Sequence, residues 1–498
     1  MYIAENKHVE LDLGSSQFKT LLYKASDLIE ELYSNLENKK VFCGKEAEEV
    51  EKLFHEDLPG EGKDLNELLE EVKSKIIPNS TLSISPNFFA YVTSCGTYAG
   101  IIAELLYGAL NQNCSKWHCA PAASEIEKVV VDWIGKFIGY PGHGGSLTSG
   151  GSAANMSCLA ASRKAKAPFD IANDGLKYGP QLTYYASTET HSCVDKSIDS
   201  LGIGKKNLRK IPVNKDFRIN TEELEKQIVK DKSNGLYPIC VIGNAGTVNT
   251  GAIDPLDKLA EICKKYNLWF HVDAAYGGPA ASTDIAKHLF NGLEYADSVA
   301  LDPHKWLYVP IEAGCALVKD IKTLREMFSI LPNYLKLDIE KSHRFEFMEH
   351  TFQLSRSFKA LKLWMTFKAY GADKLKKSIE DNIKVMRYLG ELISKSEDFE
   401  LLAPVTLSTV CFRYKTKELP LSKDEQYLSK LNKRLLELAE KDGRVFITGT
   451  MIADNEVALR ACSVNHRTKK KHVENLINVL RELAEKAHFS LTREQLLH

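Results

Sequence analysis

Two short stretches decide the fold: HVDAAY at residues 271–276 and DPHKW at residues 302–306. Each follows a short apolar run typical of a buried strand, so the carboxylate of Asp273 and the amine of Lys305 stand at or just past strand ends. In mostly parallel sheets, ligands bind beyond the carboxyl ends of the strands, so both groups are expected to face one site. The apolar surroundings of Lys305 predict a desolvated amine with a lowered pKa.

This pair of side chains suits pyridoxal phosphate (PLP). A lysine amine can hold the aldehyde carbon of PLP as an imine, while an aspartate keeps the pyridine nitrogen protonated. A protonated ring is a strong electron sink, which indicates carbanion chemistry on an amino acid. His271 and Asp273 could instead form a metal pair, because alternate residues of a strand share a face. No third ligand cluster supports that alternative, so no metal is expected.

Three further motifs could complete such a site. The sequence GGSAAN at residues 150–155 opens a helical run, where small residues and free amides suit a phosphate, although a flexible glycine turn is the alternative. His191 lies between an apolar strand and a helix and could stack on a cofactor ring and move protons, or simply begin the helix. Thr247 follows another strand and offers a hydroxyl, in what is otherwise a plain turn.

Composition excludes several classes of partner. The 498 residues carry 65 basic and 66 acidic side chains, so a polyanion or an anionic membrane is not favoured. No apolar stretch approaches the roughly 20 residues that span a bilayer, and the first 20 residues do not resemble a signal peptide. The 11 cysteines are scattered, without a Cys-x-x-Cys pair. We therefore expect a reduced cytoplasmic protein that binds neither nucleic acid nor membrane.

The chain divides into three predicted regions. Residues 1–85 read as amphipathic helices suited to packing on another body, such as a second subunit. Residues 86–375 alternate helices with apolar runs, which predicts a large α/β domain with a mostly parallel sheet. Residues 376–498 read as a small α+β domain with strands near 407–414 and 457–464. The strands expected in the large domain are 182–186, 238–242, 268–272, 298–301 and 315–318.

From about residue 86 to 467 the sequence resembles the PLP-dependent group II amino-acid decarboxylases, especially the aromatic-L-amino-acid decarboxylases. HVDAAY and PHKW at this separation carry the resemblance, with support from FFAY at 88–91, PNYLK at 332–336 and LKLW at 361–364. The resemblance implies a fold-type I, transferase-like enzyme with a seven-stranded sheet. It also implies a homodimer with active sites shared between the subunits.

The resemblance also implies roles for individual residues. Lys305 would carry the cofactor, Asp273 would pair with the ring nitrogen, and His191 and Ala275 would lie against the two ring faces. Tyr334 would reach the neighbouring subunit's site and protonate the carbon that has lost its carboxylate. The remaining cofactor contacts would be Ser152, Ala153, Ala154, Thr247, Asp302 and His304. Asp302 departs from the asparagine of animal relatives, and a carboxylate is awkward beside a phosphate unless it is protonated or turned away.

The implied substrate contacts are less typical of the family. The residues concerned are Tyr91, Thr93, Ser94, Asn113, Ser115, Trp117 and Ser355. Asn113 and Ser115 replace bulky apolar residues, which indicates a more polar or roomier pocket, and Ser355 favours a phenolic over an indolic substrate. The predicted reaction is therefore decarboxylation of an aromatic L-amino acid such as tyrosine, phenylalanine, DOPA or tryptophan. Alternatives are an acidic, histidine or diamino substrate, an aromatic aldehyde synthase, or a PLP-binding scaffold without catalysis.

Overall fold

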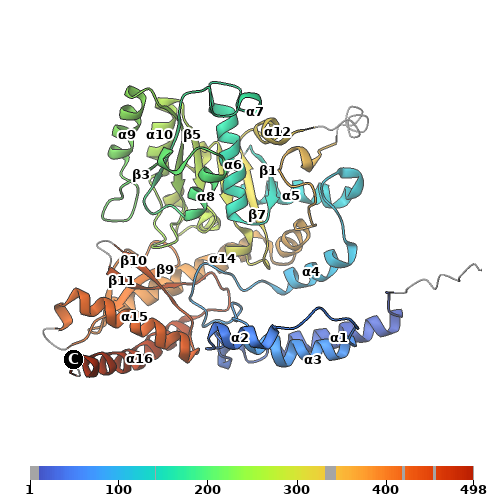
Figure 1. Cartoon of the computed structure of the whole chain (residues 1–498), viewed down its shortest axis with the longest axis vertical. Coiled ribbons are helices and arrows are strands. Elements are labelled where there is room, and N and C mark those ends of the chain that lie inside the picture. The colour runs from blue at the N-terminus through green and yellow to red at the C-terminus, as the bar shows by residue number, and fades with distance from the viewer. Residues whose placement is uncertain (1–10, 141, 331–343, 418–420, 453–455, 497–498) are drawn as a thin grey trace, which may run out of the picture.

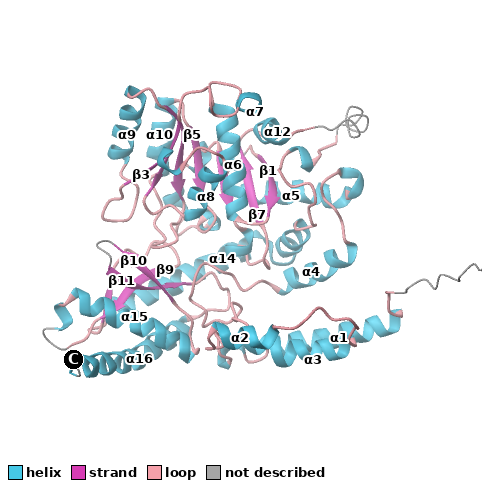
Figure 2. Cartoon of the chain, viewed as in Figure 1, coloured by secondary structure: helices cyan, strands magenta, loops and turns pink. Residues whose placement is uncertain are grey.

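A seven-stranded sheet forms the centre of the large domain (Figures 1 and 2). The computed structural model describes residues 11–140, 142–330, 344–417, 421–452 and 456–496. Five neighbouring strands are parallel and β7 runs antiparallel to both of its neighbours, which confirms a mostly parallel sheet. The order is β1 (Gly144–Thr148), β7 (Gly314–Val318), β6 (Ser298–Leu301), β5 (Trp269–Asp273), β4 (Tyr237–Asn244), β2 (Leu182–Ser187) and β3 (Leu208–Ile211).

Successive residues of a strand point to opposite faces of the sheet. Both faces of this sheet are apolar, so helices cover both of them. On β2, Tyr185 belongs to one apolar core while Tyr184 and Ala186 belong to another. The first core includes residues of α5 (Pro121–Phe137), α9 (Thr221–Ser233) and α10 (Leu256–Tyr266). The second includes residues of α6 (Gly151–Lys166) and α8 (Ser192–Ser200), with α7 (Ile171–Asp174) and α12 (Lys322–Phe328) beside it.

The edge strand β1 was not predicted, because its sequence GGSLT looks like a glycine turn. A side chain at Gly145 would place its Cβ 2.3 Å from the Ala316 carbonyl oxygen on β7. Glycine therefore permits the close approach of the two strands instead of marking a loop. β1 leads directly into the glycine-rich start of α6, so it helps to position that helix.

The small domain is a four-stranded antiparallel sheet backed by two helices (Figure 1). Its strands follow the order β10 (Thr448–Ile452), β11 (Glu456–Cys462), β9 (Thr409–Tyr414) and β8 (Phe399–Leu401). The two helices are α15 (Glu425–Asp442) and α16 (Lys470–Leu496). The long helix α14 (Ala360–Ser394), kinked at Gly371, precedes this sheet and contains the predicted boundary at 375/376, so the domain limits stay a prediction.

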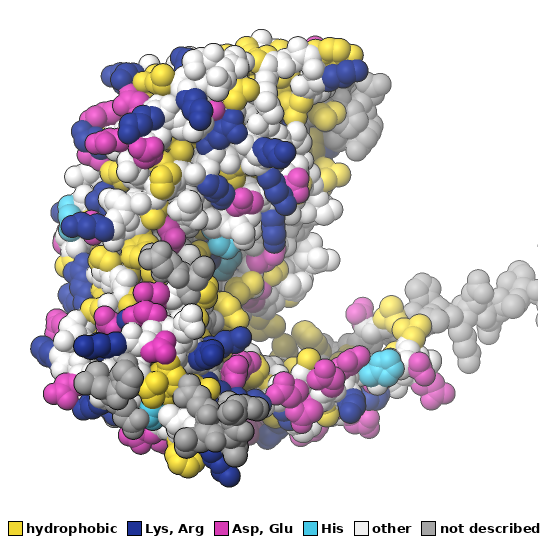
Figure 3. Space-filling view, turned by 60° about the vertical axis from the view of Figure 1, so that its left-hand side comes forward, with side chains coloured by type: hydrophobic (Ala, Val, Ile, Leu, Met, Phe, Trp, Pro, Cys, Tyr) yellow, Lys and Arg dark blue, Asp and Glu magenta, His cyan; other side chains and the backbone are white. Residues whose placement is uncertain are grey.

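The N-terminal helices α1 (Ser15–Tyr33), α2 (Ala47–Phe54) and α3 (Leu65–Glu71) lie together below α4 in Figure 1 and form an arm that extends from the body, whose outline Figure 3 shows. The arm and the nearby helix α4 (Tyr98–Leu110) leave large apolar side chains exposed. These include Phe18, Tyr23, Ile29, Leu65, Leu68, Ile102, Leu105, Leu106 and Leu110. Within the described ranges, no helix combines the length and apolar character needed to cross a bilayer.

Candidate active site

A cavity of about 360 Å³ lies at the carboxyl ends of the parallel strands, a size typical of small-molecule sites. It brings together nine of the predicted cofactor contacts from five separate stretches of sequence. These are Ser152, Ala153, His191, Thr247, Asp273, Ala275, Asp302, His304 and Lys305. The cavity therefore has an anion-binding end, an amine and a carboxylate within one enclosure.

The start of α6 forms the anion-binding end. Amides in the first turn of a helix lack intrahelical acceptors and the helix dipole favours negative charge there, so Gly151, Ser152 and Ala153 can donate to a phosphate. Ala154 is different from the prediction: it is fully buried, does not line the cavity, and its amide already donates to the Gly150 carbonyl at 2.9 Å. The amides of this turn that can still donate to an anion are therefore those of Gly151, Ser152 and Ala153.

Asp273 ends β5 with its carboxylate at the cavity wall. Its side chain is nearly buried, and Oδ1 accepts a hydrogen bond from the Ala275 amide at 3.1 Å. This bond fixes the carboxylate against the loop that carries Ala275, a second wall residue. A fixed, nearly buried carboxylate is the arrangement that a protonated ring nitrogen requires.

His271, two residues earlier on β5, connects this strand to α6 and β6. It is fully buried, with Nε2 at 2.7 Å from Asn155 Oδ1 of α6 and Nδ1 at 2.8 Å from Ser298 Oγ of β6. Burial lowers the pKa of His271 to about 4, so the ring is neutral near pH 7. Both ring nitrogens are used within the core, and the described residues contain no group of three His, Cys, Asp or Glu side chains that could hold a metal.

His191 caps the start of helix α8 and lines the cavity. Its Nδ1 accepts the Cys193 amide at 3.1 Å, so the alternative of a helix-capping histidine is also realised. Burial and the nearby Lys305 lower the pKa of His191, although Asp273 acts in the opposite direction. A neutral, orientated imidazole at a cavity wall is suited to lie against a flat ring.

A buried polar network that was not predicted from the sequence holds the loop before His191. Asn244 donates to Ser187 Oγ, Thr190 Oγ1 and Asp254 Oδ2 at 2.8–3.1 Å. Asp254 is fully buried and also accepts the amides of Ile219 and Asn244. The network joins the end of β4 to the turn before His191. Thr247 lies nearby, with its Oγ1 3.0 Å from Thr250 Oγ1 and 3.1 Å from the Ala252 amide.

Lys305 lies on the short helix α11 (Pro303–Trp306), with its side chain 22% exposed. Its Nζ is 2.8 Å from Asp302 Oδ2. Burial lowers the pKa of Lys305, but the charge and hydrogen bond of Asp302, with Asp273 further away, raise it above its usual value. The predicted lowering was therefore wrong, because the sequence argument considered desolvation and not the carboxylate three residues earlier.

His304 and Glu312 complete this wall. His304 Nδ1 lies 2.8 Å from the Ala313 carbonyl oxygen, and its Nε2 lies 3.9 Å from Asp302 Oδ2. Glu312 was missed by the sequence argument. It lines the cavity and pairs with Lys359 Nζ at 3.2 Å, yet it belongs to no motif that distinguishes it from a surface glutamate.

The predicted substrate contacts do not line this cavity in a single chain. Ser94 donates to the Val464 carbonyl at 3.1 Å, Tyr91 is exposed, and Thr93 is half-buried. Asn113, Ser115 and Trp117 lie instead on one segment, residues 113–117, that packs against residues 344–359. We call these two stretches the substrate-side segments. Tyr334 lies outside the described residues.

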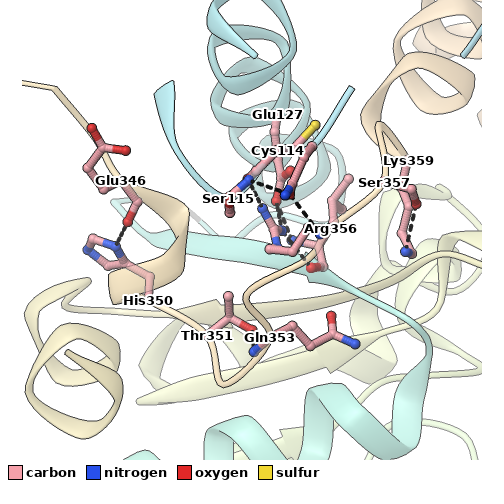
Figure 4. A network of polar contacts seen from close by, with 12 residues as sticks. Cys114, Ser115, Glu127, Glu346, His350, Thr351, Gln353, Arg356, Ser357 and Lys359 are labelled. Atoms are coloured by element: carbon pink, nitrogen blue, oxygen red, sulfur yellow. Dashed lines mark hydrogen bonds and ion pairs between the residues drawn. The ribbon is translucent and has the colours of Figure 1, made fainter. Parts of the chain in front are cut away.

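A buried ion pair fixes one of the substrate-side segments, residues 344–359, to helix α5 (Figure 4). Arg356 bonds to Glu127 of α5, and both side chains are almost fully buried. Arg356 also donates to the carbonyls of Cys114 at 3.0 Å and Leu147 at 2.9 Å. Leu147 belongs to β1, so the same guanidinium connects these segments to the strand that leads into the phosphate-binding turn. Ser355, beside Arg356, is exposed.

An amine, a fixed carboxylate and a helix N-terminus at the carboxyl ends of a mostly parallel sheet fit PLP and define a PLP-dependent enzyme of fold type I. The conserved-domain profile described as "Pyridoxal-dependent decarboxylase conserved domain" matches residues 47–415. The chain belongs to this family of carboxy-lyases, which confirms the resemblance seen in the sequence.

Individual relatives agree with that assignment. The chain is 32% identical over 483 residues to the aromatic-L-amino-acid decarboxylase of Bacillus atrophaeus, covering 96% of this chain and 98% of the relative. It is also 32% identical over 486 residues to the phenylacetaldehyde synthase of Petunia hybrida, covering 95% of each. The crystal structure of Oryza sativa TDC with PLP and tryptamine superposes with a TM-score of 0.89 at 26% identity, covering 96% of this chain and 99% of that one.

Proposed function

We propose that this protein is an amino-acid decarboxylase acting on an aromatic L-amino acid, with Lys305 and Asp273 at the centre of its chemistry. The observation that carries the proposal is the presence of both side chains in one cavity with the free amides of α6. The names of the relatives support an aromatic substrate, since they include aromatic-L-amino-acid and tyrosine decarboxylases.

Bound PLP would supply an electron sink for the bond to the carboxylate. The residues of this chain would hold and orient it. Gly151, Ser152 and Ala153 would donate to its phosphate, Asp273 would accept from its ring nitrogen, and His191 would cover one face with Ala275 on the other. Thr247 and His304 would complete the enclosure. Lys305 would hold it covalently and give way to the substrate amine.

Orientation is what selects loss of the carboxylate over loss of a proton. The bond that is perpendicular to the conjugated plane is the one that breaks, so the residues that hold the substrate decide the outcome. We propose that Tyr91, Thr93, Ser94, Asn113, Ser115, Trp117 and Ser355 take this role. In one chain they lie outside the cavity, which favours a site completed by a second copy.

We therefore propose a homodimer with shared active sites. The exposed apolar side chains of the N-terminal arm and of α4 support this, because monomeric proteins rarely expose large contiguous apolar patches. We also propose a cytoplasmic location. All 11 cysteines are free thiols in the structure, and nine of them are buried, which suits a reducing compartment.

The decisive experiment is a spectral and product assay on the purified protein. PLP should give an absorption band near the visible edge that shifts on addition of substrate, with release of carbon dioxide. The substrate panel is tyrosine, phenylalanine, DOPA, tryptophan, histidine, glutamate and diaminobutyrate. Turnover of only the last three would overturn the aromatic assignment, and a colourless protein would overturn PLP binding.

Aldehyde synthesis is the second candidate, because phenylacetaldehyde synthases are among the relatives at 32% identity. We propose that the hydroxyl of Tyr334 returns a proton to the substrate carbon and so directs the reaction towards the amine. The variant Tyr334→Phe should lose amine and gain aldehyde and peroxide. An unchanged amine yield would remove this role from Tyr334, and aldehyde from the unmodified enzyme would favour the second candidate.

A further inference from the structure

Asp302 is placed between the two groups that PLP must engage. Its Oδ2 lies 2.8 Å from Lys305 Nζ. A Cβ built on Gly151, the first residue of α6, would lie only 2.6 Å from the same oxygen. Asp302 is 2% exposed, and its Oδ1 is buried without a hydrogen-bond partner among the described residues. One carboxylate therefore contacts both the reactive amine and the anion-binding turn.

This arrangement creates two conflicts for cofactor loading. Lys305 must be a neutral amine to attack an aldehyde, yet the ion pair with Asp302 favours the ammonium form. A phosphate at the start of α6 would also face the charge of Asp302, and two anions at close range repel. Moving one proton from Lys305 to Asp302 removes both conflicts, because it leaves a neutral amine and an uncharged acid. The net charge of the pair does not change.

We propose that Asp302 takes the proton of Lys305 when the cofactor is loaded and then remains as the neutral acid beside the phosphate. In this step an N–H bond of the Lys305 ammonium breaks, and an O–H bond forms at Asp302 Oδ2 along the existing hydrogen bond. The acid then offers a donor where the carboxylate offered only repulsion. The inference rests on the proposed function, because it assumes that Lys305 holds PLP.

Other charged or titratable groups among the described residues also surround the amine, and each of them has another contact. His304 Nδ1 is engaged with the Ala313 carbonyl, Asp273 with the Ala275 amide, and Glu312 with Lys359. The His191 Nδ1 accepts the Cys193 amide, and burial keeps the Cys193 thiol protonated. Among the described residues, Asp302 is the carboxylate within hydrogen-bonding distance of Lys305 Nζ, which makes Asp302 the acceptor.

The first test measures Lys305 in the cofactor-free protein. Reductive methylation with formaldehyde, read at the Lys305 peptide by mass spectrometry, gives the pH midpoint of its neutral form. We expect a midpoint above the ordinary lysine value of about 10.4. In Asp302→Asn the midpoint should fall by at least about one unit, which is about tenfold more labelling at neutral pH. The control Asp297→Asn changes a half-buried carboxylate that accepts the Phe270 amide, and it should leave the midpoint in place.

The second test compares binding of PLP with binding of pyridoxal, which lacks the phosphate. If Asp302 is neutral in the loaded protein, Asp302→Asn changes the preference for PLP over pyridoxal by less than about threefold. A preference that rises about tenfold or more would mean that Asp302 stays an anion there, and would overturn the proposal. A wild-type midpoint at or below the ordinary lysine value would overturn it as well, even if the variant failed to fold. Because labelling needs no cofactor, its result is separate from a failure of PLP binding.

Discussion

The cofactor cavity and the substrate-side segments contrast in how they are built. The cavity draws its wall from many strand ends of one chain, and nearly every residue expected from the motifs lies in that wall. The substrate-side segments lie outside it, and Arg356 fixes them to α5 through a buried ion pair with Glu127. A covalent cofactor demands particular chemical groups, so its residues can be recognised in a sequence. Substrate contacts depend on how segments are brought together, which short motifs do not record.

Among substitutions in the cofactor cavity, Lys305→Ala is expected to have the largest effect on activity. Removing the residue that we propose to hold PLP covalently should reduce decarboxylation by roughly 10³-fold or more. The visible absorption band of bound PLP should disappear as well. The control is Lys319→Ala, an exposed lysine just past β7 at the opposite edge of the sheet, which should retain activity. A coloured, active Lys305→Ala protein would contradict the proposed covalent role of Lys305.

On the substrate side, Arg356→Met should reduce stability rather than chemistry. It leaves the Glu127 carboxylate buried without its counter-charge, which typically costs about 3–5 kcal/mol of unfolding free energy. Urea unfolding measures this loss, and Arg344→Met, at an exposed arginine, should cost less than about 1 kcal/mol. The double variant Arg356→Met/Glu127→Leu should recover much of the loss. Equal losses for Arg344 and Arg356 would show that the ion pair does not hold these segments.

The contribution of the buried His271, next to the cofactor cavity, to the free energy of unfolding should be sensitive to acid. The pKa of His271 is about 4 in the folded protein and 6.5 in the unfolded chain, so between these values the unfolded chain binds a proton that the folded protein does not. Stability should therefore fall as the pH drops from 6.5 towards 4, with about 3 kcal/mol from this residue. Urea unfolding of His271→Gln should show a shallower decline than that of His288→Gln, at an exposed histidine. Identical declines would contradict the assignment.

The smallest effect is expected at Ser355. Replacing Ser355 by glycine should shift preference from tyrosine towards tryptophan by about 1–3 kcal/mol at most, since one hydroxyl or methylene discriminates weakly. The ratio of kcat/KM for the two substrates measures the shift. The matched control is Ser357→Gly, at an exposed serine two residues further on. If both variants shift the ratio equally, Ser355 does not contact the substrate.

Much of the fold followed from the sequence, for identifiable reasons. Strands β2, β4, β5, β6 and β7 are rich in apolar residues, because they are buried on both faces. The strands β1, β3, β8 and β10 were missed, being glycine-rich, partly polar or short. The buried pairings of Arg356 with Glu127 and of His271 with Asn155 join residues more than a hundred positions apart. No local pattern encodes such pairings.

The pKa of Lys305 is raised, although the sequence predicted a lowered value. The carboxylate that raises it is only three residues away, within the motif itself. Residues three apart on a helical turn are neighbours, so this contact could have been anticipated. The prediction followed burial alone, while the structure shows that a close opposite charge outweighs it.

The distribution of thiols gives this protein a built-in reporter. Of its cysteines, Cys119 is the exposed one, Cys43 is half-buried and the other nine are buried. Cys119 lies two residues beyond Trp117, the last residue of a substrate-side segment. A maleimide fluorophore should therefore attach there first, without engineered substitutions. Its emission would tell an experimenter, in real time, whether another molecule has covered that stretch of the surface.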